Sequence, residues 1–362
     1  GHAEPRVREG VGVRAVRVVV NGDPLDAVRV EDVPVPEPEA GEVRVAVAAA
    51  SVNFGDLARC RGTVASVMGQ VPFTLGMDVC GTVDAVGDGV DPAWLGRRVV
   101  GMARQSLGGM AEWACCPVNG VFPAPPELDD VEAAAFLLPF HVAHLALVRR
   151  ARLAPGETLL VVGGASAVGT AMIQIGRAVG ATVLAVAGGA DKAALCERLG
   201  ATGLDRTTEA PGDDLFDRVM ARTGGRGADV VVDLIGGDAT ESVWTCVAPE
   251  GRYVPVGFND DPESGMTGRP LRKVAMGNFS VIGVLLSYND LPLEFRRFGL
   301  APFAPAVGPE THAALLELVA AGTIRPVVGR VVTMDDVAAA LDDHDHRRTS
   351  GRTVVDVAGS RS

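Results

Sequence analysis

The sequence has little of several features that mark particular classes of protein. Aromatic residues are 4% of its 362 residues, and tyrosine occurs only twice. None of its six cysteines is part of a C-x-x-C pair, which argues against a disulfide-rich scaffold. No apolar run approaches the roughly 20 residues of a membrane-spanning helix. We expect a globular protein whose cysteines are reduced and mostly buried.

Positive charge is also scarce, because 33 Lys and Arg residues face 45 Asp and Glu residues and leave a net charge of −12. Nonspecific binding to nucleic acid or to an anionic membrane requires basic patches, so neither partner is expected. The first residues, Gly1-His2, resemble the remnant of a purification tag, and no signal-peptide pattern follows them. The expected location is the cytoplasm.

Two domains are the expectation for a chain of this length. Over about the first 140 residues, short segments alternate between apolar and polar residues and end at glycine or proline. This pattern is typical of strands in a small barrel-like β domain. The predicted strands of this part are residues 13–21, 42–49, 81–87 and 98–101.

From about Leu137 onward, short apolar runs alternate with helical stretches. Such alternation predicts a parallel sheet with helices on both faces. The predicted strands are residues 157–162, 182–186, 229–233 and 251–256, and the predicted helices between them are residues 168–179 and 192–199. After about Ser280 the pattern is mixed, with a helix over 310–321 and a final strand over 352–357.

A glycine-containing turn joins the first of these strands to the first helix. It reads Gly164-x-Ser166-x-x-Gly169, which is the dinucleotide-binding pattern G-x-G-x-x-G with serine at the middle position. Small residues let the backbone approach a pyrophosphate, and the helix N-terminus offers free N–H groups. Two roles of Ser166 stay open, since its hydroxyl either bonds a phosphate or restricts the approach. The alternative for the whole turn is a purely structural one.

The end of the next strand decides which dinucleotide is expected. NAD sites carry Asp or Glu there to bond the ribose hydroxyls, but this chain has Ala187. Gly188 and Gly189 leave room for a 2′-phosphate, and Lys192 and Arg206 supply positive charge. The sequence therefore predicts NADPH as the cofactor. The alternative for Lys192 is a solvated lysine at a helix start.

Several further motifs, in the same order, point to one family. Ser51–Asp56 contains an Asn-x-x-Asp segment, and Gly76–Gly81 matches G-x-E-x-x-G with Asp78 in place of Glu. The other matching segments are Gly108–Trp113, Gly227–Asp233, Gly251–Gly257, Gly322–Pro326 and Ser350–Arg352. Over nearly its whole length the chain resembles the medium-chain dehydrogenase/reductase superfamily, in its zinc-free quinone oxidoreductase and enoyl reductase branch.

The resemblance implies an α/β plus β fold, in which a GroES-like β-barrel domain accompanies a Rossmann domain with a doubly wound parallel sheet. The GroES-like catalytic domain is expected at residues 1–139 and 283–362, and the Rossmann domain at residues 140–282. The cofactor is expected in the cleft between the domains. Homodimers joined through edge strands of the Rossmann sheets are also implied.

The resemblance further implies that no metal is bound. Zinc-dependent relatives place a cysteine where Asn53 and Phe54 stand here, and a histidine where Met77 stands. Cys115-Cys116 has no partners at ligand spacing. Without a Lewis acid, reduction of a simple ketone loses its main means of stabilising an alkoxide. The expected substrates are therefore quinones or α,β-unsaturated carbonyls, whose reduction products are already stabilised.

By the same resemblance, Asn53 lies near the nicotinamide, Gly257, Phe258 and Val284 line its pocket, and Arg352 holds phosphate or local structure. The alternative for Asn53 is a residue that only caps a helix or makes a turn. The full set of predicted cofactor contacts is Asn53, Gly164, Ser166, Ala167, Val168, Gly169, Gly188, Gly189, Lys192, Arg206, Ile235, Gly257, Phe258, Val284 and Arg352.

A proton donor is harder to identify. Enoyl reductases of polyketide synthases often carry a tyrosine after the Asn-x-x-Asp segment, and residues 61–65 contain none. Tyr288 is the predicted alternative, whereas Tyr253 lies inside a strand and is expected in the core. The predicted catalytic residues are Asn53, Asp56 and Tyr288. Asp56 is alternatively only a hydrogen-bond anchor for its loop, and water is alternatively the proton source.

Two histidines, His141 and His144, lie on the helix that enters the Rossmann domain, and either reaches the cleft or packs at the domain junction. Two other functions remain open beside the NADPH-dependent quinone or enone reductase. One is a zinc-free dehydrogenase acting on another carbonyl or alcohol. The other is a non-catalytic protein that binds NADPH.

Overall fold

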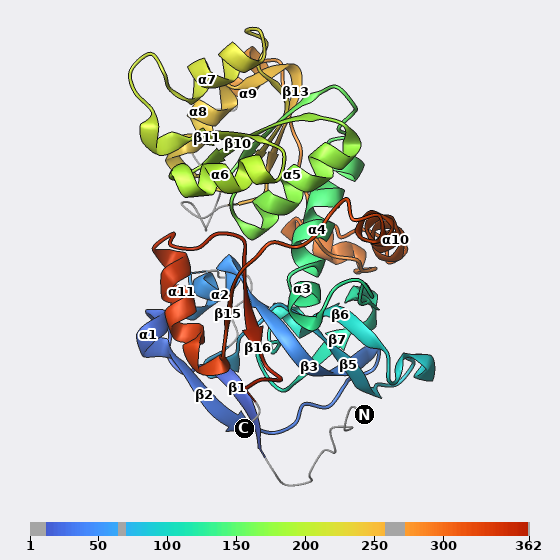
Figure 1. Cartoon of the computed structure of the whole chain (residues 1–362). Coiled ribbons are helices and arrows are strands. Elements are labelled where there is room, and N and C mark those ends of the chain that lie inside the picture. Colours follow the sequence, from blue (N-terminus) through green and yellow to red (C-terminus); the bar gives the residue numbers. More distant parts are fainter. Residues whose placement is uncertain (1–11, 64–69, 258–271, 361–362) are drawn as a thin grey trace. The chain divides into compact units, whose positions relative to one another are not determined.

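A computed structural model describes residues 12–63, 70–257 and 272–360 and divides the chain into two compact units (Figure 1). The barrel unit consists of Gly1–Leu137, Ala304–Pro309 and Val328–Ser362. The parallel-sheet unit consists of Leu138–Phe303 and Glu310–Val327. No helix within the described ranges is long and apolar enough to cross a membrane.

These units are not the predicted domains residue for residue, and the domain boundaries of the sequence analysis stay a prediction. Residues up to Phe303 and from Glu310 to Val327 group with the parallel sheet, whereas everything after residue 282 was predicted to belong to the other domain. Hydrogen bonds explain the grouping, because His312 contacts His141 and the backbone of Arg325 bonds Gln174.

Antiparallel pairing dominates the barrel unit, as the alternating sequence pattern predicts. Its larger sheet has the order β15-β16-β3-β5-β6-β8, with β7 also paired to β3, and its smaller sheet has the order β2-β1-β4. The strands are β1 (Val13–Val18), β2 (Val28–Val33), β3 (Glu42–Val52), β4 (Phe73–Thr74), β5 (Asp78–Val86), β6 (Arg98–Met102), β7 (Trp113–Pro117), β8 (Val121–Pro123), β15 (Val328–Val332) and β16 (Arg352–Asp356). Valines of these strands are the most frequent residues in the core between them.

Short helices close the barrel unit. They are α1 (Pro24–Ala27), α2 (Phe54–Arg61), α3 (Asp130–Ala134) and α11 (Val337–Asp345). Helix α2 begins after Asn53 and ends at Gly62, whose φ of 69° is the left-handed value that glycine adopts most easily.

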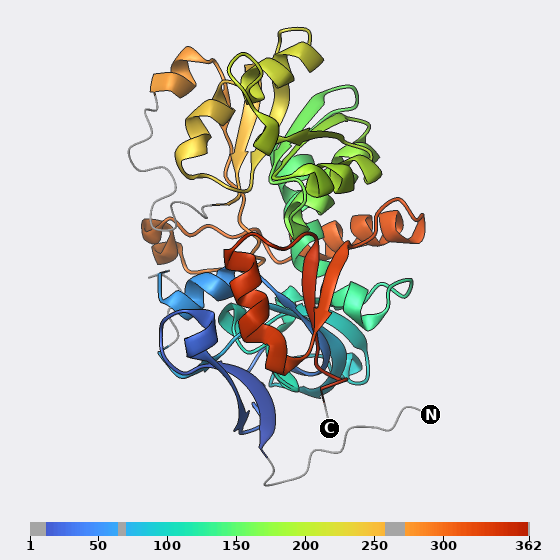
Figure 2. The ribbon, with the colours of Figure 1, turned by 60° about the vertical axis from the view of Figure 1, so that its left-hand side comes forward.

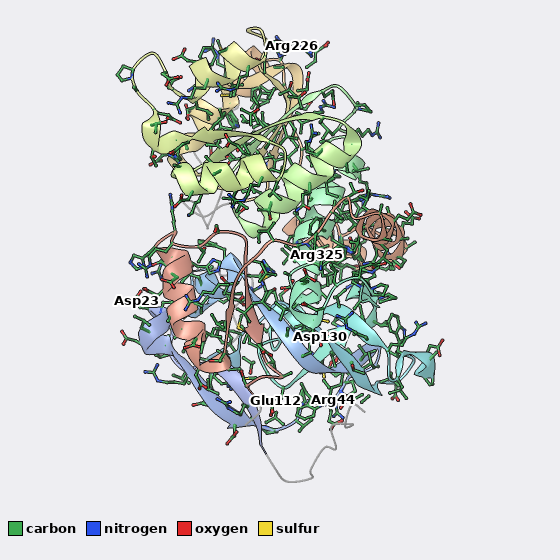
Figure 3. All side chains as sticks on the ribbon, in the orientation of Figure 1. Asp23, Arg44, Glu112, Asp130, Arg226 and Arg325 are labelled. Carbon is green, nitrogen blue, oxygen red and sulfur yellow. The ribbon has the colours of Figure 1, made fainter. Side chains whose placement is uncertain are left out.

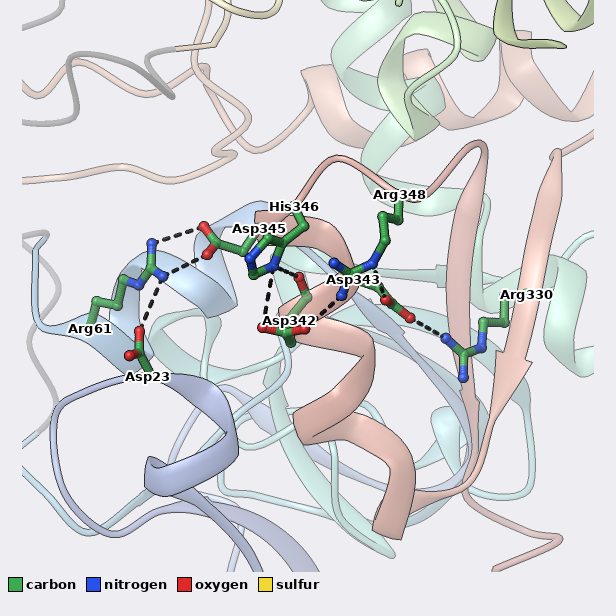
Figure 4. A network of polar contacts seen from close by, with 8 residues as sticks. All are labelled: Asp23, Arg61, Arg330, Asp342, Asp343, Asp345, His346 and Arg348. Atoms are coloured by element: carbon green, nitrogen blue, oxygen red, sulfur yellow. Dashed lines mark hydrogen bonds and ion pairs between the residues drawn. The ribbon is translucent and has the colours of Figure 1, made fainter. Parts of the chain in front are cut away.

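A network of ion pairs holds α11 against its neighbours (Figure 4). Arg61 at the end of α2 lies 2.7 Å from Asp345, and Arg330 of β15 lies 2.6 Å from Asp343. Arg348 forms ion pairs with Asp342 and Asp343, which lie near the end of α11. Exposed pairs of this kind contribute little each, so the network fixes position more than it adds stability.

The parallel-sheet unit contains one sheet with the order β11-β10-β9-β12-β13-β14, and every strand pair in it is parallel. The strands are β9 (Thr158–Val162), β10 (Thr182–Ala187), β11 (Thr202–Asp205), β12 (Ala228–Asp233), β13 (Val247–Pro255) and β14 (Ser280–Val281). In chain order this is 3-2-1-4-5-6, the doubly wound arrangement that was predicted. The winding direction reverses between β9 and β12, and ligands of such sheets bind at the carboxyl ends of the strands beside that point.

Helices cover both faces of this sheet, with those of residues 167–198 on one side and those of residues 215–244 on the other (Figure 2). The helices of the unit are α4 (Leu137–His144), α5 (Ala167–Val179), α6 (Ala190–Arg198), α7 (Leu215–Arg222), α8 (Thr240–Trp244), α9 (Arg272–Met276) and α10 (Val307–Ala320), and a π-helical turn over Leu145–Arg150 follows α4.

Candidate functional site

The turn between β9 and α5 packs its backbone unusually closely. Gly163 and Gly164 both donate their N–H groups to the carbonyl of Val186, at 3.1 and 2.9 Å. A Cβ atom on Gly169 would come within 2.2 Å of the Gly163 carbonyl oxygen. Only glycine fits there, so the turn delivers the N-terminus of α5 directly to the carboxyl edge of the sheet.

Ser166 is the N-cap of α5, a role that neither of its two predicted interpretations included. Its Oγ accepts the N–H of Gly169 at 3.0 Å and donates to the carbonyl of Gly163 at 2.8 Å. Both bonds hold the turn in shape. Ala167 and Val168 are the first residues of the helix, where backbone N–H groups have no carbonyl partner within the helix.

A buried glutamine ties α5 to the segment Gly322–Pro326. The side-chain amide of Gln174 donates to the carbonyl of Arg325 at 3.0 Å and accepts its N–H at 2.8 Å. Arg325 is labelled in Figure 3. This paired bond holds the segment against the helix that carries the glycine turn.

Further predicted contacts lie at the same edge of the sheet, because parallel strands end on one side. Ile235 follows β12, and its N–H bonds the Asp233 carboxylate at 2.9 Å. Gly257 follows β13, and a Cβ atom there would lie 1.9 Å from the Leu234 carbonyl oxygen. Phe258, the next predicted contact, lies outside the described residues, and Val284 is half-buried after β14.

At the end of β10, Ala187 is buried and Gly189 has a φ of 104°. Gly188 is exposed, Lys192 is half-buried in the first turn of α6, and Arg206 is exposed after β11. A Cβ atom on Gly188 or Gly189 would meet no atom within 4 Å, while the contacts of Lys192 and Arg206 with a 2′-phosphate stay a prediction.

Asp205, the last residue of β11, was missed by the sequence analysis. Its Oδ1 accepts the N–H of Gly189 at 2.9 Å and the hydroxyl of Thr207 at 2.7 Å. The bonds from Thr207 and the one from Gly189 lower the pKa of this carboxyl. A carboxylate two strands away from the glycine turn gives no signal in local sequence, since only the β10–β11 pairing brings it to Gly189.

In the barrel unit, Asn53 and Arg352 meet on one buried carboxylate, that of Asp78. The Asn53 amide donates to Asp78 Oδ1 at 2.9 Å, and the Arg352 guanidinium lies 3.0 and 3.1 Å from the two Asp78 oxygens. Ser51 donates to the same Asp78 oxygen at 2.5 Å. All four residues are at most 5% exposed, so the ion pair between Asp78 and Arg352 is shielded from water. The hydrogen bonds from Ser51 and Asn53 replace those that the Asp78 carboxylate would make to water.

Asp56 is fully buried and satisfied by backbone groups. Its carboxylate accepts the N–H of Asn53 at 2.8 Å and that of Gly76 at 3.1 Å. Burial nevertheless raises its pKa from 3.8 to about 6. These contacts favour the alternative in which Asp56 anchors its loop. Asn53 likewise precedes the first residue of α2, which agrees with its alternative as a helix-start residue.

Across the parts of the chain that the structure describes, no three His, Cys, Asp or Glu side chains gather to hold a metal ion. All six cysteines are buried and free. Burial raises the pKa of the Cys60 thiol to about 11 and that of Cys80 to about 12, so these sulfurs remain protonated and make poor metal ligands near neutral pH.

Tyr288 lies in the parallel-sheet unit and is 7% exposed. Its hydroxyl oxygen is 2.8 Å from His141 Nδ1, and His141 Nε2 is 3.1 Å from His312 Nδ1. Burial lowers the pKa of His141 well below its usual value, and burial also raises that of Tyr288. His141 and Tyr288 were predicted separately as candidates, whereas His312, which lies on α10, was not predicted. Tyr253 is in the core as predicted, where it donates to Asp233 at 2.8 Å.

Two known families match the chain. Residues 39–126 match the family described as "Alcohol dehydrogenase GroES-like domain". Residues 167–298 match the family described as "Zinc-binding dehydrogenase". The first match covers most of the barrel unit's strands, and the second covers α5 and the strands from β10 to β14 of the parallel sheet, which confirms the predicted combination of a GroES-like domain with a Rossmann domain.

Two relatives match the chain over different lengths. It is 31% identical over 335 residues to the quinone oxidoreductase of Rattus norvegicus, a match that covers 92% of this chain and 94% of the rat protein. It is 34% identical over 218 residues to the quinone oxidoreductase-like protein 2 homolog of Nematostella vectensis, covering 60% of this chain and 58% of that protein.

Solved structures agree with these matches. A probable oxidoreductase from Mycobacterium abscessus superposes with a TM-score of 0.78 at 30% identity, covering 96% of this chain and 99% of the other. A mycobacterial protein in complex with NADPH superposes with a TM-score of 0.81 at 27% identity, covering 95% and 100%. The chain therefore belongs to the medium-chain dehydrogenase/reductase superfamily, in the branch that contains the quinone oxidoreductases.

Proposed function

We propose that this oxidoreductase transfers hydride from NADPH to a quinone or to the conjugated C=C of an α,β-unsaturated carbonyl, without zinc. Family membership makes it an oxidoreductase with a nicotinamide cofactor. The rat relative is named a quinone oxidoreductase, which supports the electrophile class.

The residues at the carboxyl edge of the parallel sheet fit a dinucleotide. The closely packed turn at Gly164 and Gly169 leads into the N-terminus of α5, whose first N–H groups have no carbonyl partner within the helix and would suit a pyrophosphate. For the adenosine end, the absence of a carboxylate at Ala187 and the charge of Lys192 support NADPH over NADH. The neighbouring structure that contains NADPH agrees with this choice.

Zinc, which the description of one matching family implies, does not fit the residues present. Asp78 lies in the segment where that class carries metal-binding residues, yet both its oxygens are bonded to Arg352 and Oδ1 also accepts from Ser51 and Asn53. A cation there would have to displace a buried guanidinium. Met77, in the place of the expected histidine, offers only a weakly binding thioether. This occupied carboxylate is the observation that carries the zinc-free proposal.

The chemistry needs little more than alignment in a dry site. NADPH supplies a hydride, which adds to a quinone or to the β-carbon of an enone. The product is a hydroquinone anion or an enolate, which delocalises its charge without a Lewis acid. The protein then has to hold the reactants in place and supply a proton. We assign orientation near the nicotinamide to Asn53, whose amide the Asp78–Arg352 pair fixes, and proton donation to Tyr288.

A panel of electrophiles tests the proposal. Purified protein is mixed with NADPH or NADH, and loss of nicotinamide absorbance is followed with a 1,4-quinone, an α,β-unsaturated ketone and a saturated aldehyde. We expect turnover with NADPH and with the quinone or the enone. Turnover on the aldehyde alone would select a dehydrogenase acting on another carbonyl. Binding of NADPH without turnover on any electrophile would select a non-catalytic protein.

A further inference from the structure

Three buried side chains in the parallel-sheet unit form a continuous hydrogen-bonded chain. Tyr288 comes from the segment after β14, His141 from α4 and His312 from α10. The distances are 2.8 Å from the Tyr288 hydroxyl to His141 Nδ1 and 3.1 Å from His141 Nε2 to His312 Nδ1. The two imidazoles are 0% and 3% exposed. Both nitrogens of His141 are thus used, one toward each neighbour.

This arrangement has the chemistry of a proton wire. A neutral imidazole carries one proton and accepts at its other nitrogen, so each histidine passes a proton through by taking it at one nitrogen and releasing it from the other. Burial, together with the neighbouring His312 and His144, disfavours the charged form of His141. A proton can therefore pass along Tyr288, His141 and His312 through neutral tautomers of the two histidines, without a buried imidazolium cation.

Two hydrogen arrangements satisfy the observed distances. In the arrangement before proton delivery, His312 Nδ1–H donates to His141 Nε2, and His141 Nδ1–H donates to the Tyr288 oxygen, so the tyrosine proton is directed away from His141. In the arrangement after delivery, Tyr288 donates to His141 Nδ1, and His141 Nε2–H donates to His312 Nδ1. Both contain the same number of protons, because each of the three groups carries one.

We propose that Tyr288, His141 and His312 are a proton relay that reprotonates the catalytic tyrosine from the α10 side of the parallel-sheet unit. The inference rests on the proposed reductase function and deepens it. His141 and His312 act through Tyr288 and are positioning and relay residues, while Tyr288 alone meets the substrate.

Hydride addition leaves an anion on the substrate, and Tyr288 gives its hydroxyl proton to that anion. Tyr288 then takes the Nδ1 proton of His141, and His141 takes the Nδ1 proton of His312 at its own Nε2. His312 gains a proton from water at Nε2. One proton enters, one leaves, and nothing in the relay is oxidised or reduced.

The proposed direction of proton transfer follows from the assignment of proton donation to Tyr288, which is four residues beyond Val284, a predicted neighbour of the nicotinamide. Exposed residues lie beside both ends of the relay: Asn289 and Asp290 follow Tyr288, and Glu310 and Ala313 lie beside His312. Either end can therefore exchange a proton with water, and the His312→Gln variant tests which end does so.

The first test needs no substrate or cofactor. Ring ¹⁵N resonances of the histidines are recorded at pH 7 in the protein and in Tyr288→Phe, with His141→Gln and His312→Gln used for assignment. We expect neutral His141 and His312, and we expect both to shift in Tyr288→Phe while His344 of the barrel unit does not. A doubly protonated His141, or a His312 that ignores the loss of the tyrosine hydroxyl, would overturn the relay.

The second test follows product formation on the millisecond scale with whichever electrophile the protein reduces. Tyr288→Phe should slow the first turnover by about 10²-fold or more, the usual size of general acid catalysis. His312→Gln should keep a normal first turnover, because Tyr288 still holds a proton, and then fall at least about tenfold in steady state. His144→Gln, on the same helix as His141, is the matched control and should show no burst.

The outcomes separate the relay from the function. If the wild type turns over but His312→Gln shows neither a burst nor a slower steady state, the relay is wrong and the reductase function stands. If the wild type reduces neither electrophile with either nicotinamide, the function is wrong and the catalytic relay falls with it. In that case the ¹⁵N result still reports whether the three groups are coupled as a structural unit. NADPH affinity, measured by fluorescence, should be the same in all variants.

Discussion

Two charged residues lie near the Gly188–Gly189 turn in the fold, and in the proposed NADPH complex they would act in opposite directions on the 2′-phosphate. Lys192, in the first turn of α6, would attract it, while the Asp205 carboxylate, bonded to the Gly189 N–H at 2.9 Å, would repel it. The proposed preference for NADPH would thus be a balance between two charges, and each can be removed separately.

Replacing Lys192 by alanine should weaken NADPH binding by about 10- to 100-fold, the size of one charge-assisted hydrogen bond, and leave NADH binding unchanged. Fluorescence titration of both cofactors measures this directly. Lys273→Ala, which removes a lysine from α9 of the same unit, is the matched control for net charge. Equal losses for NADPH and NADH would show that Lys192 does not contact the 2′-phosphate.

Asp205→Asn should have the opposite effect. The amide oxygen still accepts the Gly189 N–H, so the turn keeps its shape, but the negative charge is gone. We expect tighter NADPH binding and an unchanged NADH affinity in the same titration. Weaker binding of both cofactors would instead mean that the carboxylate itself is needed to hold the turn.

Asp56 makes stability depend on pH in an unusual direction. Its pKa is about 6 in the folded protein and 3.8 when exposed, so between these values the folded state binds the proton more tightly. This contribution to stability is therefore present at low pH and falls as pH rises from about 4 to about 6, by up to roughly 3 kcal/mol.

Urea denaturation from pH 4 to pH 7 checks this against Asp56→Asn, which cannot titrate. The free energy of unfolding of the wild type minus that of the variant should decrease over this interval and then level off. A difference that is constant with pH would contradict the raised pKa. His344, whose pKa is lowered to about 4, is common to both proteins and cancels in the comparison.

At the scale of elements, the glycine turn between β9 and α5 has no room for a side chain at Gly169. Gly169→Ala would favour helix formation by up to about 1 kcal/mol on propensity alone, yet its Cβ would lie 2.2 Å from a carbonyl oxygen. We expect the steric clash to outweigh the gain in helix propensity. The free energy of unfolding should fall by about 1–3 kcal/mol, and cofactor binding should weaken. Gly283→Ala adds the same methyl to open space and should leave thermal unfolding unchanged. A stable, NADPH-binding Gly169→Ala would show that the turn is not closed.

The sequence pattern predicted the elements of the parallel sheet closely, because local hydrophobic periodicity is enough to identify buried strands and the helices between them. The helix predicted over 168–179 is α5 at Ala167–Val179, and the strand over 182–186 is β10 at Thr182–Ala187. The turn at Gly164–Gly169 was found because its residues are contiguous. Asp205, His312 and the bonds of Ser51 to Asp78 were not, because pairing of distant segments creates them. The N-cap role of Ser166 is a local feature, but it was not predicted because Ser166 was compared only with the middle glycine of the G-x-G-x-x-G pattern.

At the scale of the whole molecule, the family resemblance predicts a homodimer joined through edge strands of the parallel sheets. In this chain the edge strand beside β13 is β14, and its Val281 is 39% exposed. Light scattering after size-exclusion chromatography should give a dimer for the wild type and a monomer for Val281→Lys. Val331→Lys, at a 49% exposed valine of β15, is the control and should remain dimeric. A monomeric wild type, or a dimeric Val281→Lys, would exclude this interface.

The central claim is an NADPH-dependent reductase that works without zinc, and metal-depleted protein tests it most directly. The protein is treated with a chelator, its zinc content is measured by mass spectrometry, and NADPH oxidation is followed with a 1,4-quinone and an α,β-unsaturated ketone. Because Arg352 neutralises Asp78, we predict full activity with at least one electrophile at negligible zinc, and no increase when zinc is added back. Activity that disappears with the metal and returns with zinc would contradict the account.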